Sequence, residues 1–148
     1  MPLAHLEDRS VLRLSGPDTR DFLQGQITND IGLLAAGRPL YAGLLSPQGK
    51  ALFAFLLWAD GEDVLIDCTA TDAEDLARRL AMFRLRKKVE IAPEPGLAVF
   101  ADWGQVATGH ASDPRHPPAG TRWLAAPATE TPDASLADWH QHRLAQAL

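Results

Sequence analysis

Three apolar runs dominate the middle of the chain, at residues 40–45, 50–58 and 64–68. Short runs of this length, bounded by turn residues, are typical of β-strands. The turn signals SPQG and DGED, at residues 46–49 and 60–63, separate the runs. The pattern therefore predicts a three-stranded antiparallel meander.

Alternating apolar residues at 10–14 predict a further strand that leads into a helix. Gly16 and Pro17 follow this strand, and proline is favoured in the first turn of a helix. Phe22 and Ile27 would then share one apolar face of that helix.

Thr71 and Glu74 have the spacing of a capping box, which predicts the start of a second helix. The residues that follow repeat apolar side chains at helical spacing. Leu76, Leu80 and Phe83 form one stripe, which we expect to pack into the core.

The second half of the chain is rich in loops, because seven of the eleven prolines fall between residues 93 and 132. We expect a mobile loop at 104–120 and an amphipathic helix over 135–148. Short strands are predicted at residues 88–91, 97–101 and 121–127. Together these elements predict an α+β fold, with antiparallel sheets and two or three helices, in a single domain spanning residues 1–148.

Composition and charge narrow the class of protein. Hydrophobic residues make up 46% and charged residues 22% of the 148 residues, which is usual for a globular domain. The formal net charge of −5 argues against a general binder of nucleic acid such as tRNA. A signal peptide and a long apolar stretch are both absent, so we expect a cytoplasmic protein without membrane contact. Cys68 ends the predicted strand VLIDC, and we expect an inert core thiol there.

Common catalytic motifs are absent from the sequence, which has no glycine-rich phosphate loop and no Gly-x-Ser-x-Gly. The histidines form no His-x-x-x-His pair, so no metal site and no catalytic residue is predicted. Segment 78–88 holds six of the fourteen basic residues, as either a solvated helix end or a site for phosphate or carboxylate groups. Trp139 and Arg143 share a face of the predicted last helix, a pairing that can stack on a flat ring and hold a carboxylate.

A polar stretch, LQGQITND at residues 23–30, stands where the first helix should end and holds more polar groups than a turn needs. It belongs to a longer block, LSGPDTRDFLQGQITNDI, followed by YAGLLSPQGK, FRLRKKVEI and the closing helix with Trp139, Arg143 and Leu144. In this order and spacing the blocks resemble the YgfZ-type folate-binding proteins. These are relatives of the glycine-cleavage aminomethyltransferase, or T-protein, that support iron–sulfur cluster assembly and repair. The resemblance covers nearly the whole chain.

The resemblance implies a tetrahydrofolate-binding domain that supports iron–sulfur cluster assembly or repair, with folate and iron–sulfur proteins as partners. It also implies that the polar stretch helps line the folate cavity, since amides and carboxylates match the donors and acceptors of a pterin ring. For each polar side chain of the stretch, a helix C-cap and polar turn is the alternative interpretation. The cofactor-binding residues predicted in this way are Gln24, Asn29, Asp30, Tyr41, Trp139 and Arg143.

Two departures from the family pattern bear on function. The T-protein carries a catalytic aspartate thirteen residues after the tyrosine that matches Tyr41, and this position is Ala54 here. A methyl group is neither an acid nor a base, so a classical aminomethyltransferase is not expected. The family also continues past the closing helix into a Lys-Gly-Cys signature that this sequence does not reach. We therefore expect the N-terminal portion of a longer protein.

Two other functions stay open at this point. One is a folate-dependent, aminomethyltransferase-like enzyme that uses another acid or base. The other is an interaction module that binds RNA or an acidic partner through segment 78–88. Salt-dependent binding to tRNA would favour the interaction module.

Overall fold

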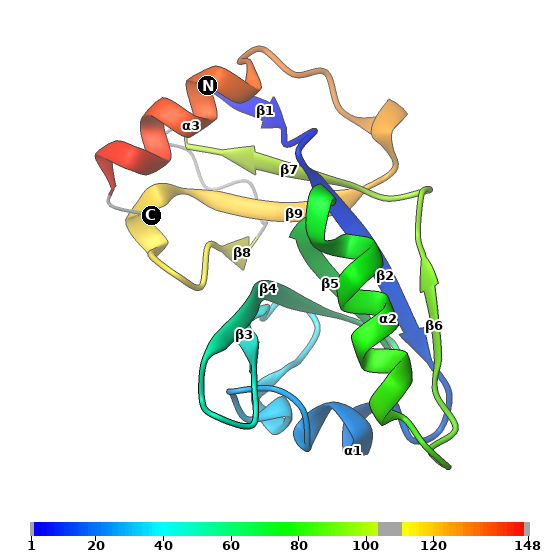
Figure 1. Cartoon of the computed structure of the whole chain (residues 1–148). Helices are drawn as coiled ribbons and strands as arrows, with labels where there is room; N and C mark the ends of the chain where they lie inside the picture. The colour runs from blue at the N-terminus through cyan, green and yellow to red at the C-terminus, as the bar shows by residue number, and fades with distance from the viewer. Residues whose placement is uncertain (1, 104–110, 147–148) are drawn as a thin grey trace. The chain divides into compact units, whose positions relative to one another are not determined.

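Two antiparallel sheets and three α-helices form the structure, a computed structural model that describes residues 2–103 and 111–146 (Figure 1). This confirms the α+β class. Contacts divide the chain into two compact units: unit 1 is Met1–Arg9 with Pro95–Leu148, and unit 2 is Ser10–Glu94. The single domain over residues 1–148 stays a prediction, because two compact units can belong to one domain or to two.

The sheet of unit 2 has five strands in the order β3-β4-β5-β2-β6 (Figure 1). The predicted meander is confirmed, since Leu57 pairs with Leu40 on one side and with Ile66 on the other. The strand expected at residues 88–91 lies two residues later. The strands are β2 (Arg9–Ser15), β3 (Leu40–Leu45), β4 (Ala51–Asp60), β5 (Asp63–Thr69) and β6 (Glu90–Pro93).

One face of this sheet carries the apolar core of unit 2. Alternate residues of each strand point into it, as the period of two along a strand requires. Phe55, Leu57 and Ile66 have no exposed surface, and Cys68 is 1% exposed, so the thiol lies in the core as expected. Helices α1 (Thr19–Gln24) and α2 (Ala73–Phe83) cover this face with apolar side chains.

The first helix is shorter than the sequence pattern predicts. Thr19 is its first residue, so Pro17 lies just before the N-cap, Asp18, rather than in the first turn. The helix ends at Gln24, and Ile27 forms an isolated bridge with Leu44 instead of extending the helical face.

The predicted capping box of the second helix is wrong. A short 3-10 helix, η2 (Ala70–Asp72), includes Thr71, and α2 begins after the N-cap Asp72 without a side-chain hydrogen bond. The predicted apolar stripe is only partly buried. Leu76 and Leu80 are buried, but Phe83 is 41% exposed because it ends the helix beyond the edge of the core.

A close backbone contact joins the start of α1 to the residues after α2. Gly16 has φ +118°, and a Cβ at this position would lie 2.2 Å from the Lys88 carbonyl oxygen. Asp18 adds a hydrogen bond, since its Oδ2 accepts from the Lys88 amide at 2.7 Å. Glycine is needed here by both its conformation and the close approach.

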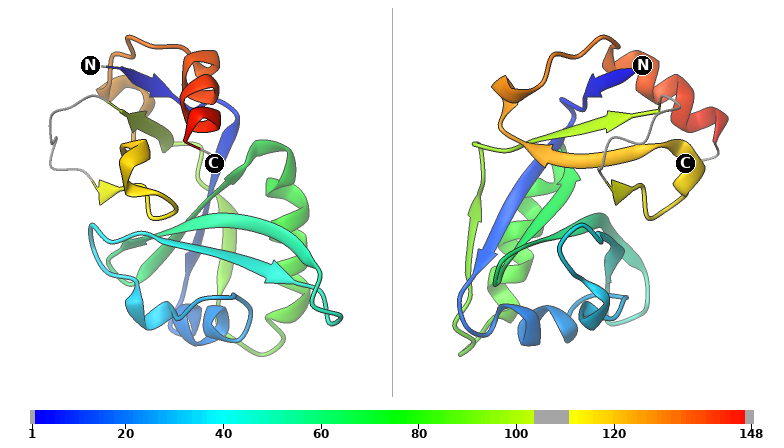
Figure 2. Two further views of the ribbon diagram at one scale, coloured as in Figure 1. Left: turned by 90° about the vertical axis from the view of Figure 1, so that its left-hand side faces the viewer. Right: turned by 180° about the vertical axis from the view of Figure 1, so that it is seen from behind.

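The sheet of unit 1 has four strands in the order β1-β7-β9-β8. Strands β1 and β8 were not predicted, because they are too short to show a clear apolar pattern. Helix α3 (Leu136–Ala145) lies beside β1 (Figure 2). The strands are β1 (Leu3–His5), β7 (Ala98–Asp102), β8 (Ala111–Ser112) and β9 (Thr121–Ala125).

Helix α3 begins with a true capping box. The Ser135 hydroxyl accepts from the Asp138 amide at 3.0 Å, and the Asp138 carboxylate accepts from the Ser135 amide at 2.9 Å. These bonds hold the pKa of Asp138 below its usual range. The helix was therefore predicted correctly, but its start signal was not recognised.

Residues 104–110, the first part of the predicted mobile loop, lie outside the described residues. The rest of that segment contains β8 and the short helix η3 (Pro117–Ala119), and η4 (Pro127–Thr129) follows β9. The mobility of the loop stays a prediction. Within the described ranges, no helix is both long and apolar enough to cross a membrane.

Candidate functional site

The polar stretch after α1 folds into a loop, residues 24–32, that we call the polar loop. Gln24 spans it, since its Oε1 accepts from the Ile31 amide at 2.9 Å and its Nε2 donates to the Asn29 carbonyl at 3.5 Å. The side chain of Gln24 thus satisfies backbone groups that no regular helix or strand pairs.

Asn29 and Thr28 attach the polar loop to strand β3. The Asn29 Nδ2 donates to the Tyr41 carbonyl at 2.9 Å. The Thr28 hydroxyl accepts from the Gly43 amide at 3.0 Å, and the Thr28 amide donates to the Gly43 carbonyl at 3.0 Å. These bonds fix the backbone of β3 beside the loop, and the ligand contact of Asn29 stays a prediction.

Asp30 is the N-cap of η1 (Ile31–Leu33), because its Oδ1 accepts from the Gly32 amide at 2.9 Å. Its side chain is exposed, and Oδ2 accepts no hydrogen bond from the described residues. One carboxylate oxygen is therefore used for the fold while the other faces solvent.

Tyr41 lies on the face of the unit 2 sheet that is opposite to the core. Its neighbours Leu40 and Ala42 contribute to the core, so the ring of Tyr41 points to the other side, where it is 46% exposed. Tyr41 pairs with Leu56, and Leu56 pairs with Asp67. The three residues form a row across this second face.

Trp58 lies on the same face, two residues from Leu56 and therefore diagonal to Tyr41, at about 7–8 Å between Cα positions in a regular sheet. It is 9% exposed, and its indole Nε1 has no hydrogen-bond partner among the described residues. Asp67 on this face is fully buried. We call Tyr41, Leu56, Trp58 and Asp67 the sheet face.

Neither Trp58 nor Asp67 was predicted to belong to a functional site. A signal for Asp67 was present, because a carboxylate stands in the otherwise apolar strand VLIDC. Ala54 pairs with Gly43 two residues from Leu56, so it lies on this face too and presents a methyl group.

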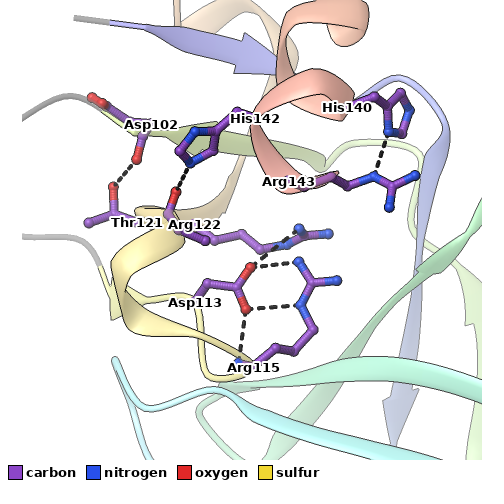
Figure 3. Close-up of polar contacts among 9 residues, drawn as sticks. Asp102, Asp113, Arg115, Thr121, Arg122, His140, His142 and Arg143 are labelled. Carbon is purple, nitrogen blue, oxygen red and sulfur yellow. Dashed lines mark hydrogen bonds and ion pairs between the residues drawn. The ribbon is translucent and has the colours of Figure 1, made fainter. Parts of the chain in front are cut away.

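The two remaining predicted residues lie in unit 1. Trp139 is 4% exposed and packs against Trp103 and His142, with ring centroids at 5.5 and 5.8 Å. Arg143 donates from Nε to His140 Nδ1 at 2.7 Å (Figure 3). Trp103 and His142 therefore cover much of the Trp139 ring surface on which a ligand would have to stack. The ligand contacts of Trp139 and Arg143 stay predictions.

A buried ion cluster in unit 1 was not predicted. Arg115 binds Asp113 through two hydrogen bonds, from Nε at 2.9 Å and from Nη2 at 2.6 Å (Figure 3). Arg122, 1% exposed, lies 4.0 Å from the same carboxylate. Burial acts to raise the pKa of Asp113, but its bonds to Arg115 and the charges of both arginines outweigh this and hold the pKa below its usual range.

Much of the basic segment 78–88 is paired locally. Arg78 bonds Glu74 and Asp75 one turn earlier, each at 3.2 Å. Lys87 pairs with Asp21 of α1, and this hydrogen bond and charge raise the pKa of Lys87.

As for metals, no group of three or more His, Cys, Asp or Glu side chains in the described part of the chain could hold an ion.

The fold defined by these elements is that of the T-protein. The solved structure of glycine cleavage system aminomethyltransferase T from Bartonella henselae matches with a TM-score of 0.61 and 19% identity, over 68% of this chain and 28% of that one. At this identity the likeness establishes the fold alone.

Sequence relatives define the family more narrowly. The iron-sulfur cluster assembly factor IBA57, mitochondrial, of Homo sapiens is 33% identical over 177 residues, covering 97% of this chain and 49% of the relative. The tRNA-modifying protein YgfZ of Vibrio vulnificus is 34% identical over 88 residues, covering 58% of this chain and 26% of the relative. No protein-family model matches. The chain belongs to the YgfZ-type relatives of the T-protein, which confirms the predicted resemblance.

The chain spans about half the length of the human relative and less of the others. The names of the IBA57 proteins of Homo sapiens, Mus musculus and Neurospora crassa include the word mitochondrial. These names contradict the predicted cytoplasmic location, which rested on a missing export signal, and mitochondrial leaders follow a different pattern.

Proposed function

We propose that the protein binds tetrahydrofolate on the sheet face and supports the assembly or repair of iron–sulfur clusters. The first half of the proposal is supported by the T-protein fold and by the side chains that the sheet face presents. The second half is supported by the names of the IBA57 relatives, which are iron–sulfur cluster assembly factors.

The indole N–H of Trp58 is the observation that carries the folate proposal. A buried donor without an acceptor costs about 1–3 kcal/mol, so native structures rarely keep one without a reason. An acceptor atom of a bound ligand would remove this cost. A pterin ring has carbonyl and ring-nitrogen acceptors along its edge, which could accept from the Trp58 N–H.

The other residues of the site have matching roles in this proposal. The exposed ring of Tyr41 offers a face on which a flat ring can stack. The free carboxylate oxygen of Asp30 and the exposed side chain of Gln24 can accept from the amino group of a pterin. Asn29 acts as a positioning residue, because it holds the backbone at Tyr41. Tetrahydrofolate, when bound, supplies a carrier for one-carbon groups.

The replacement Trp58→Phe tests the proposal, because it keeps an aromatic ring and removes the N–H. We expect the affinity for tetrahydrofolate, measured by titration calorimetry, to fall about tenfold, or 1.4 kcal/mol. We expect the free energy of unfolding without ligand to fall less than in an ordinary buried Trp→Phe variant, since removal of the costly unpaired donor offsets part of the cavity left by the smaller ring.

Trp123→Phe is the matched control. The indole N–H of Trp123 already has an acceptor, the Glu130 carboxylate at 3.3 Å in unit 1. This variant should lose some stability and keep its folate affinity. Unchanged affinity in Trp58→Phe, or no saturable heat with wild-type protein at millimolar tetrahydrofolate, would overturn the assignment.

Aminomethyl transfer is not part of the proposal. Ala54 has no group that can move a proton, and one added carboxylate supplies neither the orientation nor the amine donor that catalysis requires. Ala54→Asp should therefore show no turnover with a methylamine-loaded carrier protein. Measurable turnover would favour the enzyme alternative.

The iron–sulfur half of the proposal needs a cellular test. In cells depleted of an IBA57 relative, a protein that contains this chain should restore the activity of iron–sulfur enzymes. Restoration by wild type but not by Trp58→Phe would show that support of iron–sulfur clusters depends on the sheet face. Equal restoration by both would separate cluster assembly from the sheet face.

A further inference from the structure

A groove of about 830 Å³ lies in unit 2, away from the residues of the sheet face. One wall is the C-terminal part of α1 with the glycine that caps it, Phe22 and Gly25. The other wall is formed by the end of α2 and the turn that follows it, Phe83, Leu85 and Arg86. We call it the α1–α2 groove.

Exposed apolar side chains gather at this groove. Leu85 is 85% exposed and Phe83 is 41% exposed, and Met82 beside them is 64% exposed. Leu85 also has φ +48°, a left-handed conformation that costs a leucine about 1–2 kcal/mol. The turn is closed by a hydrogen bond from the Lys87 amide to the Arg84 carbonyl at 2.8 Å, which holds Leu85 outward.

The charge of the groove is positive. Arg84, Arg86 and Lys87 line it, against one carboxylate, Asp21. Lys87 is already paired with Asp21, and Arg84 donates to the Val89 carbonyl at 3.2 Å. Arg86 is exposed and forms no ion pair with the described residues, so it is available to an acidic group.

The walls are held in place before any partner binds. The contact between Gly16 and the Lys88 carbonyl and the bond from the Lys88 amide to Asp18 fix the turn after α2 to the start of α1. A preformed groove loses less entropy on binding than a flexible loop does.

We propose that the α1–α2 groove binds an acidic amphipathic segment of a partner protein. Apolar side chains of the segment pack on Leu85 and Phe83, and its carboxylates meet Arg86 and Arg84. An amphipathic helix uses such a surface by placing anchors at helical spacing into a groove. RNA and a polyglutamate tail would use the cations but would gain little from Leu85. This inference does not depend on folate binding.

The probe is a phage-displayed library of random peptides of about 15 residues, selected on the immobilised whole protein. We expect the enriched peptides to combine leucine, phenylalanine or tryptophan at helical spacing with several acidic residues. Synthetic fluorescent copies should bind in solution with a saturable change in anisotropy, and the affinity should fall as salt is raised.

Two variants locate the binding site. Leu85→Asn removes the apolar side chain and suits the left-handed backbone, so it should keep the fold and weaken peptide binding at least about tenfold. Arg86→Glu should weaken it as well. Leu33→Asn and Arg38→Glu are matched controls, since both side chains are exposed and neither lines the groove.

Several results would overturn the proposal. These are no enrichment, enriched peptides without acidic residues, or full affinity in Leu85→Asn. A polyglutamate peptide of equal charge that binds as tightly as a selected peptide would show an anion site instead. Tighter binding of tRNA than of any selected peptide would show that the surface serves nucleic acid.

Discussion

The two units of the chain are stabilised by different interactions. Unit 2 closes around apolar side chains of four strands and two helices, such as Phe55 and Leu76, that have no exposed surface. Unit 1 also buries apolar side chains, such as Leu6, Val99 and Phe100, but it buries charged side chains beside them. Among the described residues of unit 1, the largest fully buried side chain is that of Arg122, which lies near the Asp113 carboxylate.

The kind of buried interaction determines how strongly a mutation lowers the stability of each unit. Apolar packing depends on volume and tolerates rearrangement by degrees. A buried ion cluster depends on complete pairing, because a charge that loses its partner keeps the full cost of burial. Unit 1 should therefore respond sharply to the loss of a single carboxylate.

The largest effects should come from Asp113→Ala and Phe55→Ala. The first removes the carboxylate that pairs with Arg115 and lies near Arg122, and it should lower the free energy of unfolding by about 3–5 kcal/mol. The second leaves a cavity and should cost about 3–5 kcal/mol as well. Urea unfolding followed by tryptophan fluorescence measures both. Labelling of the single thiol, Cys68, reports the opening of unit 2, and Asp113→Ala should accelerate it less than Phe55→Ala does.

The pH dependence of Asp113→Asn tests the role of charge in unit 1. We expect this variant to lower the free energy of unfolding by about 2–3 kcal/mol at neutral pH. The folded pKa of Asp113 is depressed, so its carboxylate contributes fully above the unfolded value of about 3.9. That contribution is lost as pH falls toward the folded pKa. The stability difference between wild type and variant should therefore shrink below about pH 4. A difference that is constant with pH would contradict the role given to the charge.

Each unit contains a glycine with positive φ that lies close to a backbone carbonyl, Gly16 in unit 2 and Gly120 in unit 1. A Cβ at Gly16 would lie 2.2 Å from the Lys88 carbonyl oxygen, and one at Gly120 would lie 2.3 Å from the Asp102 carbonyl oxygen. Replacement of either by alanine should cost about 2 kcal/mol or more. Gly37→Ala is the control, because its φ is +73° but no atom lies within 4 Å, and it should cost about 1 kcal/mol. Equal costs at all three positions in urea unfolding would show that backbone conformation alone decides.

The smallest effect concerns the helix starts. Ser135→Ala removes one of the two bonds of the capping box in unit 1, from the Asp138 amide to the Ser135 hydroxyl, and should cost about 1 kcal/mol of unfolding free energy. Thr71→Ala in unit 2 should change the free energy of unfolding by less than about 0.5 kcal/mol, since Thr71 is exposed and caps no helix. Thermal unfolding of the two variants measures the difference. A larger cost for Thr71→Ala would restore the predicted capping box.

Most of unit 2 could be predicted from the sequence because apolar periodicity reflects burial directly. The meander and the buried face of α2 followed from that pattern. Helix ends were less reliable, since Ser135 and Thr71 have the same local signal and only tertiary contacts decide which one forms a cap. In unit 1 the pattern also predicted β7, β9 and α3. The ion cluster could not be predicted, because nothing local shows that Arg122 is buried or that Asp113 lies near it.

The candidate site shows the same limit. The polar loop could be recognised from its composition, but most of its side chains proved to hold the backbone rather than to stand free. Trp58 gave no signal in the sequence, since a tryptophan in an apolar strand is ordinary. Its importance follows from one unpaired N–H, which depends on the whole surrounding structure.

The order of the units along the chain has a consequence for synthesis. Unit 2 is a continuous segment placed between the two pieces of unit 1, whose strand β1 pairs with β7 across most of the sequence, as Leu3 with Asp102. A growing chain emerges from the ribosome at about 5–20 residues per second. Strand β1 therefore waits several seconds after it emerges for its partner strand, and unit 2 is completed during this wait. The unpaired edge of β1 is exposed to other chains in the meantime. Slowed translation over residues 95–103 would lengthen this wait and should increase aggregation of nascent chains without changing the finished protein.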